Sequence, residues 1–256
     1  MTKEEPRSLP IDEPLPPEAR PWQRHAATQI FAAVAAAAPV AAIGIWIYLL
    51  QDSPMTLNGM LLGPLLGGGS LIFWLLFLQF LVCGDGPAGL GFLRGRPWLD
   101  IGLGVGLSIG LLAFRFVFGA TVARLLPPRP PVEEMIELLD GLSRNPLLLA
   151  LWLGPVVWIG VALFEELLRV FLLRRLWLVW NGPVGKWAVI LGVSALTGVA
   201  HGYQGWAAIV SIGIMSVFKG WFFMTTGRVR ALVVAHALYD SAQIVMAVIM
   251  IRGMGL

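Results

Sequence analysis

Residues 162–175 read ALFEELLRVFLLRR, and they place two adjacent glutamates, Glu165 and Glu166, inside a run that is otherwise typical of a membrane helix. A carboxylate is costly near the interior of a bilayer, so an ionisable residue at such a position indicates a function or a buried partner. A segment in lipid must also satisfy its own backbone hydrogen bonds, which favours a helix. The stretch therefore predicts a membrane helix whose two carboxylates have partners elsewhere in the chain.

The composition is that of a polytopic membrane protein. Of 256 residues, 57% are hydrophobic and 13% are charged, and the mean hydropathy is +0.79, too apolar for a soluble domain of this size. Several separate runs of about 20 apolar residues can each cross a membrane as a helix. No alternating pattern indicates a β-barrel. We therefore predict an all-α fold, a bundle of seven to eight transmembrane helices.

The hydropathy pattern divides the chain into four parts. Residues 1–25 are rich in proline and in charges of both signs, and we expect a disordered cytoplasmic tail. Membrane spans fill 26–131, an amphipathic connector follows at 132–145, and a C-terminal membrane core fills 146–252. The expected spans are 27–50, 60–82, 101–122, 146–180, 187–203, 206–226 and 231–251.

The basic residues predict an orientation in the membrane. The net charge of +3 is small and is spread over short loops. It is informative on membrane topology and on contact with lipid headgroups, and it does not indicate nucleic-acid binding. By the positive-inside rule, Lys and Arg place the N-terminus and the loops around 94–96, 174–186 and 228–230 on the cytoplasmic side. The loop after the third span does not fit this orientation, because it also carries basic residues. The lone Cys83 excludes an internal disulfide and a cysteine metal cluster.

Two glycine-rich stretches predict close helix packing. The second span carries consecutive glycines at positions 67–69. The third span repeats glycine at Gly102, Gly104, Gly106 and Gly110.

The last four spans carry a small set of ionisable residues. Glu165 and Arg169 are four apart and share a helix face, so the arginine can hold that carboxylate in its charged form. Glu166 is rotated by about 100° from Glu165. We expect Lys219 to snorkel or to form a pair. The full set is Glu165, Glu166, Arg169, His201, Lys219, His236 and Asp240.

Two histidines and carboxylates on three helices can build two kinds of hydrolytic site. In one, a divalent metal such as zinc is held by His201, His236 and a carboxylate, and a remaining glutamate acts as general base. In the other, a glutamate assisted by histidine activates water without a metal, and His236 with Asp240 stabilises the oxyanion. Structural histidines and a proton-coupled transporter are the competing interpretations, although the sequence has no internal repeat of the kind common in transporters.

Three motifs resemble those of a known family. EELLR at 165–169, ALTGVAHG at 195–202 and VVAHALYDS at 233–241 are similar to the motifs of the CPBP family, also called Abi. That family comprises type II CAAX prenyl endopeptidases, bacteriocin-processing proteins and their relatives. In it, arginine usually follows the glutamate pair after three residues, whereas Arg169 follows after two and Val170 occupies the usual place. Thr197 stands where the family has phenylalanine.

The resemblance implies that 146–252 is the catalytic core of an intramembrane endopeptidase, a glutamic or metallo enzyme. Its expected substrate is a peptide or protein at the lipid bilayer, and its expected place is a bacterial inner membrane. The family pattern implies that a glutamate of the pair activates water, with Arg169 orienting the pair. His201 would assist or bind metal, and His236 with Asp240 would complete the metal site or the oxyanion hole. The alternative is a non-catalytic scaffold or bacteriocin self-immunity protein of the same fold.

Overall fold

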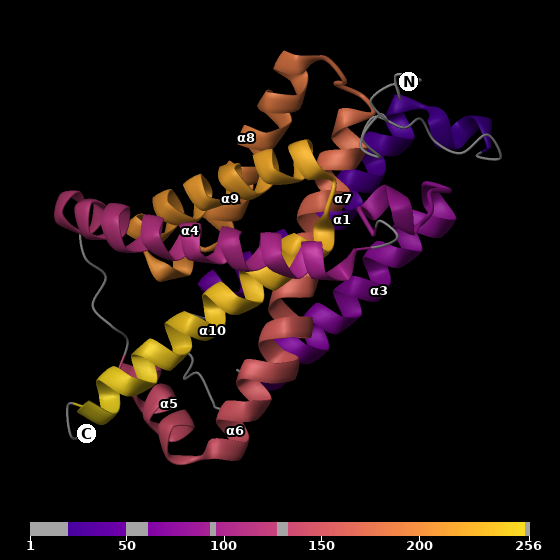
Figure 1. Ribbon diagram of the computed structural model, residues 1–256. Coiled ribbons are helices and arrows are strands. Elements are labelled where there is room, and N and C mark those ends of the chain that lie inside the picture. The colour runs from indigo at the N-terminus through magenta and orange to yellow at the C-terminus, as the bar shows by residue number, and fades with distance from the viewer. Residues whose placement is uncertain (1–19, 50–60, 93–95, 127–132, 254–256) are drawn as a thin grey trace.

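The computed structural model describes residues 20–49, 61–92, 96–126 and 133–253, so the expected tail lies mostly outside the described residues. All regular structure within them is helical (Figure 1). In chain order the elements are η2 (Pro21–Arg24), α1 (Ala26–Leu49), η3 (Gly63–Gly68), α3 (Gly69–Phe77), η4 (Leu78–Val82), η5 (Pro87–Leu90), α4 (Pro97–Leu125), α5 (Glu133–Arg144), α6 (Pro146–Leu151), η6 (Trp152–Leu163), α7 (Phe164–Trp177), α8 (Pro183–Ala200), η7 (Gly202–Gln204), α9 (Trp206–Thr226) and α10 (Val229–Gly253).

Seven stretches of the described residues are long and apolar enough to cross a membrane, which confirms the seven predicted spans. Helix α5, at 12 residues, covers only about 18 Å. It is therefore too short to be an eighth crossing. The spans are Ala26–Ile45, Gly63–Val82, Pro97–Gly119, Pro146–Trp177, Pro183–Ala200, Trp206–Thr226 and Val229–Gly253.

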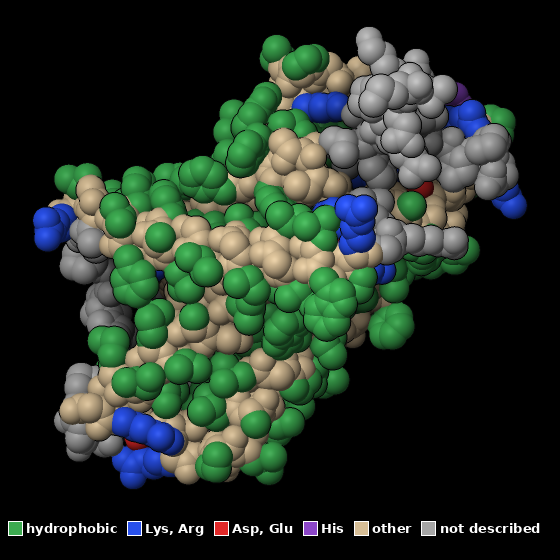
Figure 2. Space-filling model, viewed as in Figure 1, with side chains coloured by type: hydrophobic (Ala, Val, Ile, Leu, Met, Phe, Trp, Pro, Cys, Tyr) green, Lys and Arg blue, Asp and Glu red, His purple; other side chains and the backbone are tan. Residues whose placement is uncertain are grey.

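The outer surface of the bundle is apolar along the spans. Figure 2 shows hydrophobic side chains spread over the whole of one face between stretches of backbone, whereas Lys and Arg occur in a few separate groups, most of them toward its ends. Large apolar side chains such as Phe73, Val117 and Ile249 are more than 60% exposed. Such a surface suits lipid contact rather than water.

Local sequence explains where the helices begin and end. Proline stands at the start of α4, α6 and α8, where its fixed φ fits and its missing N–H is no loss. Asn145 caps α6, because its side-chain oxygen accepts from the backbone N–H of Leu147 and of Leu148, each at 3.1 Å. Helix α9 ends at Gly227, whose φ of 65° is left-handed.

The span that carries the glutamate pair is not a regular α-helix. Its middle, η6, is a π-helix, and Gly154 has φ −90° and ψ −107° just before Pro155. Proline removes a backbone donor and bends the helix there. The irregular part helps to accommodate the 32 residues of this span and leads directly into α7, which begins one residue before Glu165.

Close helix contacts occur at some of the predicted glycines. A Cβ on Gly68 would collide with the carbonyl of Gly160, and a Cβ on Gly104 would lie 2.7 Å from the side chain of Val234. The prediction is confirmed at these two positions. The prediction is wrong at five other glycines, where an added Cβ would meet no neighbouring helix within 4 Å: Gly67, Gly69, Gly102, Gly106 and Gly110.

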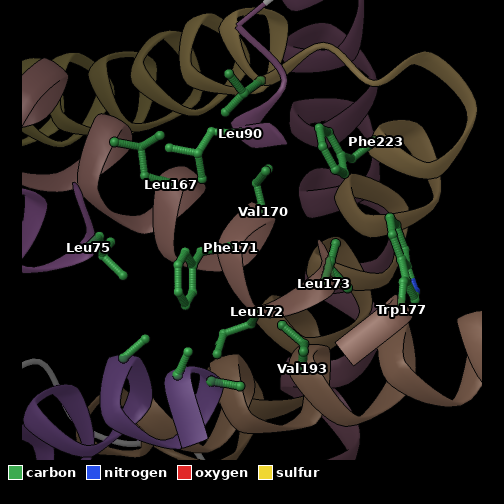
Figure 3. Packing of buried hydrophobic residues seen from close by; sticks show 14 of the residues in the cluster. Leu75, Leu90, Leu167, Val170, Phe171, Leu172, Leu173, Trp177, Val193 and Phe223 are labelled. Carbon is green, nitrogen blue, oxygen red and sulfur yellow. The ribbon is translucent and has the colours of Figure 1, made fainter. Parts of the chain in front are cut away.

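Helix α7 lies at the centre of the main hydrophobic core (Figure 3). Val170 and Phe171 are fully buried, and Trp177 stacks on Phe223 with ring centroids 6.1 Å apart. These contacts tie α7 to α1, α3, α8 and α9. The packing fixes the rotation of α7 and therefore the directions in which its two glutamates point.

A buried ionic cluster lies at the C-terminal end of α7. The sequence predicts that Arg174 and Arg175 lie in a cytoplasmic loop, and this prediction is wrong, because both side chains are buried in the structure, at 3% and 0% exposed. Arg174 Nε lies 3.0 Å from a carboxylate oxygen of Asp85, and Arg175 contacts the same oxygen and Gln29. Burial alone would raise the pKa of Asp85, but the two guanidinium groups outweigh it and hold that pKa below its usual value.

Candidate active site

Four elements bring the predicted residues into one cluster. Helix α7 supplies Glu165, Glu166 and Arg169, the residue after α8 is His201, and α10 supplies His236 and Asp240. Two further side chains come from α9, Ser216 and Lys219.

Glu166 is completely buried and is surrounded by cations. Its Oε2 accepts a hydrogen bond from Arg169 Nε at 2.9 Å, and its Oε1 accepts one from Lys219 Nζ at 2.8 Å. Arg169 and Lys219 are themselves 4% and 6% exposed. A buried carboxylate is tolerated in such a place because two cations compensate its charge.

The partner of Arg169 differs from the expected one. The sequence favours a pair with Glu165, four residues earlier, but the direct ion pair is with Glu166, three residues earlier. Both spacings make neighbours on a helix, so the local pattern does not choose between them. The contact with Ser216 favours the pair with Glu166, because the Ser216 hydroxyl accepts a hydrogen bond from Nη1 of Arg169 and holds the guanidinium on the α9 side.

Glu165 has a different environment from its neighbour. Its side chain is 24% exposed, and its two oxygens lie 3.8 Å from Nε2 of His201 and 3.9 Å from Nε2 of His236. Both distances are too long for a direct hydrogen bond and short enough for one bridging water. Glu165 is therefore the carboxylate of the pair that faces His201.

His201 is oriented by the backbone. Its Nδ1 lies 2.9 Å from the carbonyl oxygen of Thr197, which can only accept, so Nδ1 carries the proton and Nε2 faces Glu165. The Thr197 hydroxyl bonds to its own helix, at Val193. The side chain that replaces the family's phenylalanine therefore takes no part in holding the imidazole.

His236 lies between three carboxylates. Its Nε2 is 3.4 Å from Asp240 and 3.9 Å from Glu165. Its Nδ1 is 2.8 Å from Oε1 of Glu166, but the ring N–H is not aligned with that oxygen as in a regular hydrogen bond. The imidazole thus connects the fully buried carboxylate to the partly exposed ones.

Sequence reasoning missed two polar residues and gave a third only a general expectation. Tyr203 stacks on His201 with ring centroids 6.1 Å apart, and its hydroxyl accepts from Gln204 at 2.8 Å. Ser216 carries no motif of its own. The expectation that Lys219 forms a pair is confirmed, but its partner, 53 positions away, could not be read from local spacing.

The described side chains of the cluster do not have the geometry of a metal site. Among the residues that the structure describes, no three His, Cys, Asp or Glu side chains converge as ligands of one ion. The His201 and His236 Nε2 atoms stand 3.8 and 3.9 Å from Glu165, wider than the ~3.4 Å between ligands of tetrahedral zinc. The described side chains in this arrangement do not fit a metal ion, and the expected ion stays a prediction.

One of three comparisons with known proteins finds a match, and the matched segment includes this cluster. No curated protein and no solved structure matches the chain. Residues 147–242 match the family model described as type II CAAX prenyl endopeptidase Rce1-like. The matched segment begins in α6, ends in α10 and contains Glu165, Glu166, Arg169, His201, His236 and Asp240. Residues 147–242 of this integral membrane protein are therefore similar to the Rce1-like family of type II CAAX prenyl endopeptidases.

Proposed function

We propose that this protein is an intramembrane endopeptidase in which Glu165 activates the water that attacks a peptide bond. One observation carries the proposal: Glu165 is partly exposed between two imidazoles, whereas Glu166 is fully buried between two cations. A general base must reach water and be free to take its proton. Only Glu165 of the pair meets both conditions.

The reaction needs two proton transfers, one from water to Glu165 and one from Glu165 to the departing amine. Glu165 takes a proton from water as the water oxygen bonds to the scissile carbonyl carbon, and the carbonyl electrons move to the oxygen. His201 Nε2 faces the same carboxylate at 3.8 Å and orients the water. When the tetrahedral intermediate collapses, the C–N bond breaks and Glu165 returns the proton to the departing amine.

His236 and Asp240 serve the oxyanion. His236 Nε2 lies 3.4 Å from Asp240 and 3.9 Å from Glu165. With its Nδ1–H facing Glu166, His236 donates from Nε2 only as an imidazolium, and in that form it can stabilise the charge that develops on the carbonyl oxygen, a contribution of about 3–4 kcal/mol in other hydrolases. Asp240 orients the ring from the next turn of α10.

The substrate class follows from the membrane setting and the family. We propose a peptide or protein held at the lipid bilayer of a bacterial-type inner membrane. Whether a prenyl group is needed is tested with two fluorescence-quenched CAAX peptides, one farnesylated and one not.

The test uses purified protein in lipid vesicles and both peptides. We expect cleavage by the wild type and its loss in Glu165→Gln, His201→Ala and His236→Ala. Glu137→Gln, on the exposed side of α5, is the matched control and should cleave normally. Unchanged cleavage in all three site variants would refute the catalytic assignment. A cellular phenotype that survives all three would favour the non-catalytic scaffold.

Element analysis of the same protein tests the metal prediction. The metal-independent mechanism predicts cleavage that persists after chelation. Cleavage that stops with chelator and returns with added zinc would assign the site to the metallo class.

A further inference from the structure

Helix α9 contributes to the site although it carries none of the three family-like motifs. Ser216 and Lys219 are three apart and lie on one face of the helix, and they are 2% and 6% exposed. We call these two residues the α9 clamp. A lysine is rarely buried this deeply within a membrane span unless it is paired.

The α9 clamp holds the two ends of one ionic cluster. Lys219 donates to Oε1 of Glu166 at 2.8 Å. Ser216 accepts from Arg169, which donates to Oε2 of Glu166 at 2.9 Å. Each oxygen of the Glu166 carboxylate therefore has its own cation. Lys219 is part of α9, and Arg169 is held by Ser216 of α9 and by the carboxylate itself.

The contacts favour a positioning role for Ser216 over that of a nucleophile. A Ser-x-x-Lys spacing can provide a serine and its base when the amine faces the hydroxyl. Here the Lys219 amine donates to Glu166, and the Ser216 hydroxyl accepts from Arg169. Both groups are engaged with charged partners, so the clamp holds other residues in place.

The residue held in place is the one that touches His236. Oε1 of Glu166, the oxygen bound by Lys219, is also 2.8 Å from Nδ1 of His236. Although the ring N–H is not aligned for a regular hydrogen bond, a carboxylate held this close attracts it electrostatically and restrains the ring, so that the other nitrogen stays turned toward the site. That other nitrogen, Nε2, faces Asp240 and Glu165.

We infer that Lys219 is a positioning residue, which commits Glu166 to orienting His236 and so leaves Glu165 as the only glutamate that activates water. This inference rests on the proposed function. It explains why two adjacent glutamates are present: one holds the histidine and the other performs the proton transfer. Arg169 alone cannot do this, because it engages Oε2 and leaves Oε1 to Lys219.

The pairing is tested without any peptidase assay. Thermal unfolding in detergent is measured for wild type, Lys219→Met, Glu166→Gln and the double variant. We expect the double variant to lose less than the sum of the two single losses, since the residues interact directly. The control cycle combines Lys219→Met with Glu137→Gln and should be additive. Additivity in the first cycle would overturn the pairing.

The positioning role is tested by kinetics on the folded protein with the peptides above. We expect Lys219→Met to lower kcat about 10–100-fold with KM unchanged, as loss of an orienting partner does elsewhere. Lys219→Arg should recover most of the activity, because it restores a cation near Oε1. An unchanged kcat in Lys219→Met, or equal losses in Lys219→Met and Lys219→Arg, would overturn the role.

The two tests separate the possible failures. If the wild type cleaves no peptide, the proposed function and the positioning role fall together, while the thermal cycle still decides the pairing. If the wild type cleaves and Lys219→Met cleaves equally well, the proposed function stands and the inference fails.

Discussion

Glu165 and Glu166 are neighbours in sequence whose surroundings are opposite. Glu166 is 0% exposed and contacts Arg169, Lys219 and His236, whereas the side chain of Glu165 is 24% exposed and faces two imidazoles at 3.8 and 3.9 Å. Removing one member of a buried ion pair costs about 3–5 kcal/mol, because the other charge stays buried. A partly exposed carboxylate such as Glu165, the proposed general base, has no such structural cost.

Neutral variants of the two glutamates should therefore differ in what they lose, stability in one case and activity in the other. Glu166→Gln should lower stability by about 3–5 kcal/mol, because Arg169 and Lys219 lose their anion. Glu165→Gln should unfold within a few degrees of the wild type and lose about 100-fold or more of its activity. Thermal unfolding and peptide cleavage measured on the same samples distinguish them. A stability loss in Glu165→Gln as large as that in Glu166→Gln would contradict the assignment.

Asp85 offers a second residue-level test, outside the active site. It is the anion for Arg174 and Arg175, and its pKa is held below the usual value of 3.8 by these two cations despite burial. A carboxyl with a lowered pKa in the folded state adds stability above the unfolded pKa. That stability is lost as the pH falls through the folded pKa.

Asp85→Asn should therefore be less stable than the wild type near neutral pH, and the gap should close on acidification. Unfolding midpoints of both proteins between about pH 7 and about pH 3 measure this. The gap should begin to narrow near 3.8, the ordinary Asp pKa. A gap that widens toward acid would contradict the ion-pair account.

At the scale of elements, the contact between α8 and α9 positions both His201 and the α9 clamp. A Cβ on Gly198 would lie 2.5 Å from the carbonyl oxygen of Ile209 and 3.3 Å from Gly213. Both neighbours are backbone atoms, so the clash can be relieved only by moving the helices apart. Gly192, on the same helix, has open space instead.

Gly198→Ala should destabilise the protein by about 1–3 kcal/mol and reduce cleavage. The reduction follows because His201 is three residues from the clash and Lys219 lies on the displaced helix. Gly192→Ala is the matched control, which should leave stability and cleavage close to wild type. Equal effects of the two substitutions on thermal unfolding and cleavage would show that this contact does not position the site.

Contacts between elements also bring distant loops to one end of the whole molecule. Arg174 meets Asp85, Arg228 meets Asp100 at 2.7 Å, and the Val229 N–H donates to Gly91. The loop before α4, the end of α7 and the link between α9 and α10 therefore share one end. These are the segments that the positive-inside rule places in the cytoplasm.

Cysteine labelling tests this topology. In a Cys83→Ala background, which removes the chain's only cysteine, Asn181→Cys lies between α7 and α8 and Gln204→Cys lies in η7. An impermeant maleimide added to intact cells should label Gln204→Cys and should label Asn181→Cys only after permeabilisation. The reverse pattern would invert the proposed orientation.

The sequence was informative where the signal is local. Apolar runs predicted all seven spans, because the bilayer sets their length. The three motifs predicted which residues cluster. Pairings between distant elements were not predictable: Arg169 pairs with Glu166 because Ser216 on α9 holds it, and Arg174 and Arg175 are buried because Asp85 reaches them. Hydropathy alone gives no information on which glycine of a series faces a neighbouring helix.

The central claim is that Glu165 performs peptide hydrolysis at the membrane, and terminal-peptide mass spectrometry tests it without a chosen substrate. Membrane proteins from cells expressing wild type, Glu165→Gln or Glu137→Gln are compared for newly formed C-termini. We predict a set of new C-termini that wild type and Glu137→Gln share and that Glu165→Gln lacks. Identical C-termini in all three samples would contradict the claim.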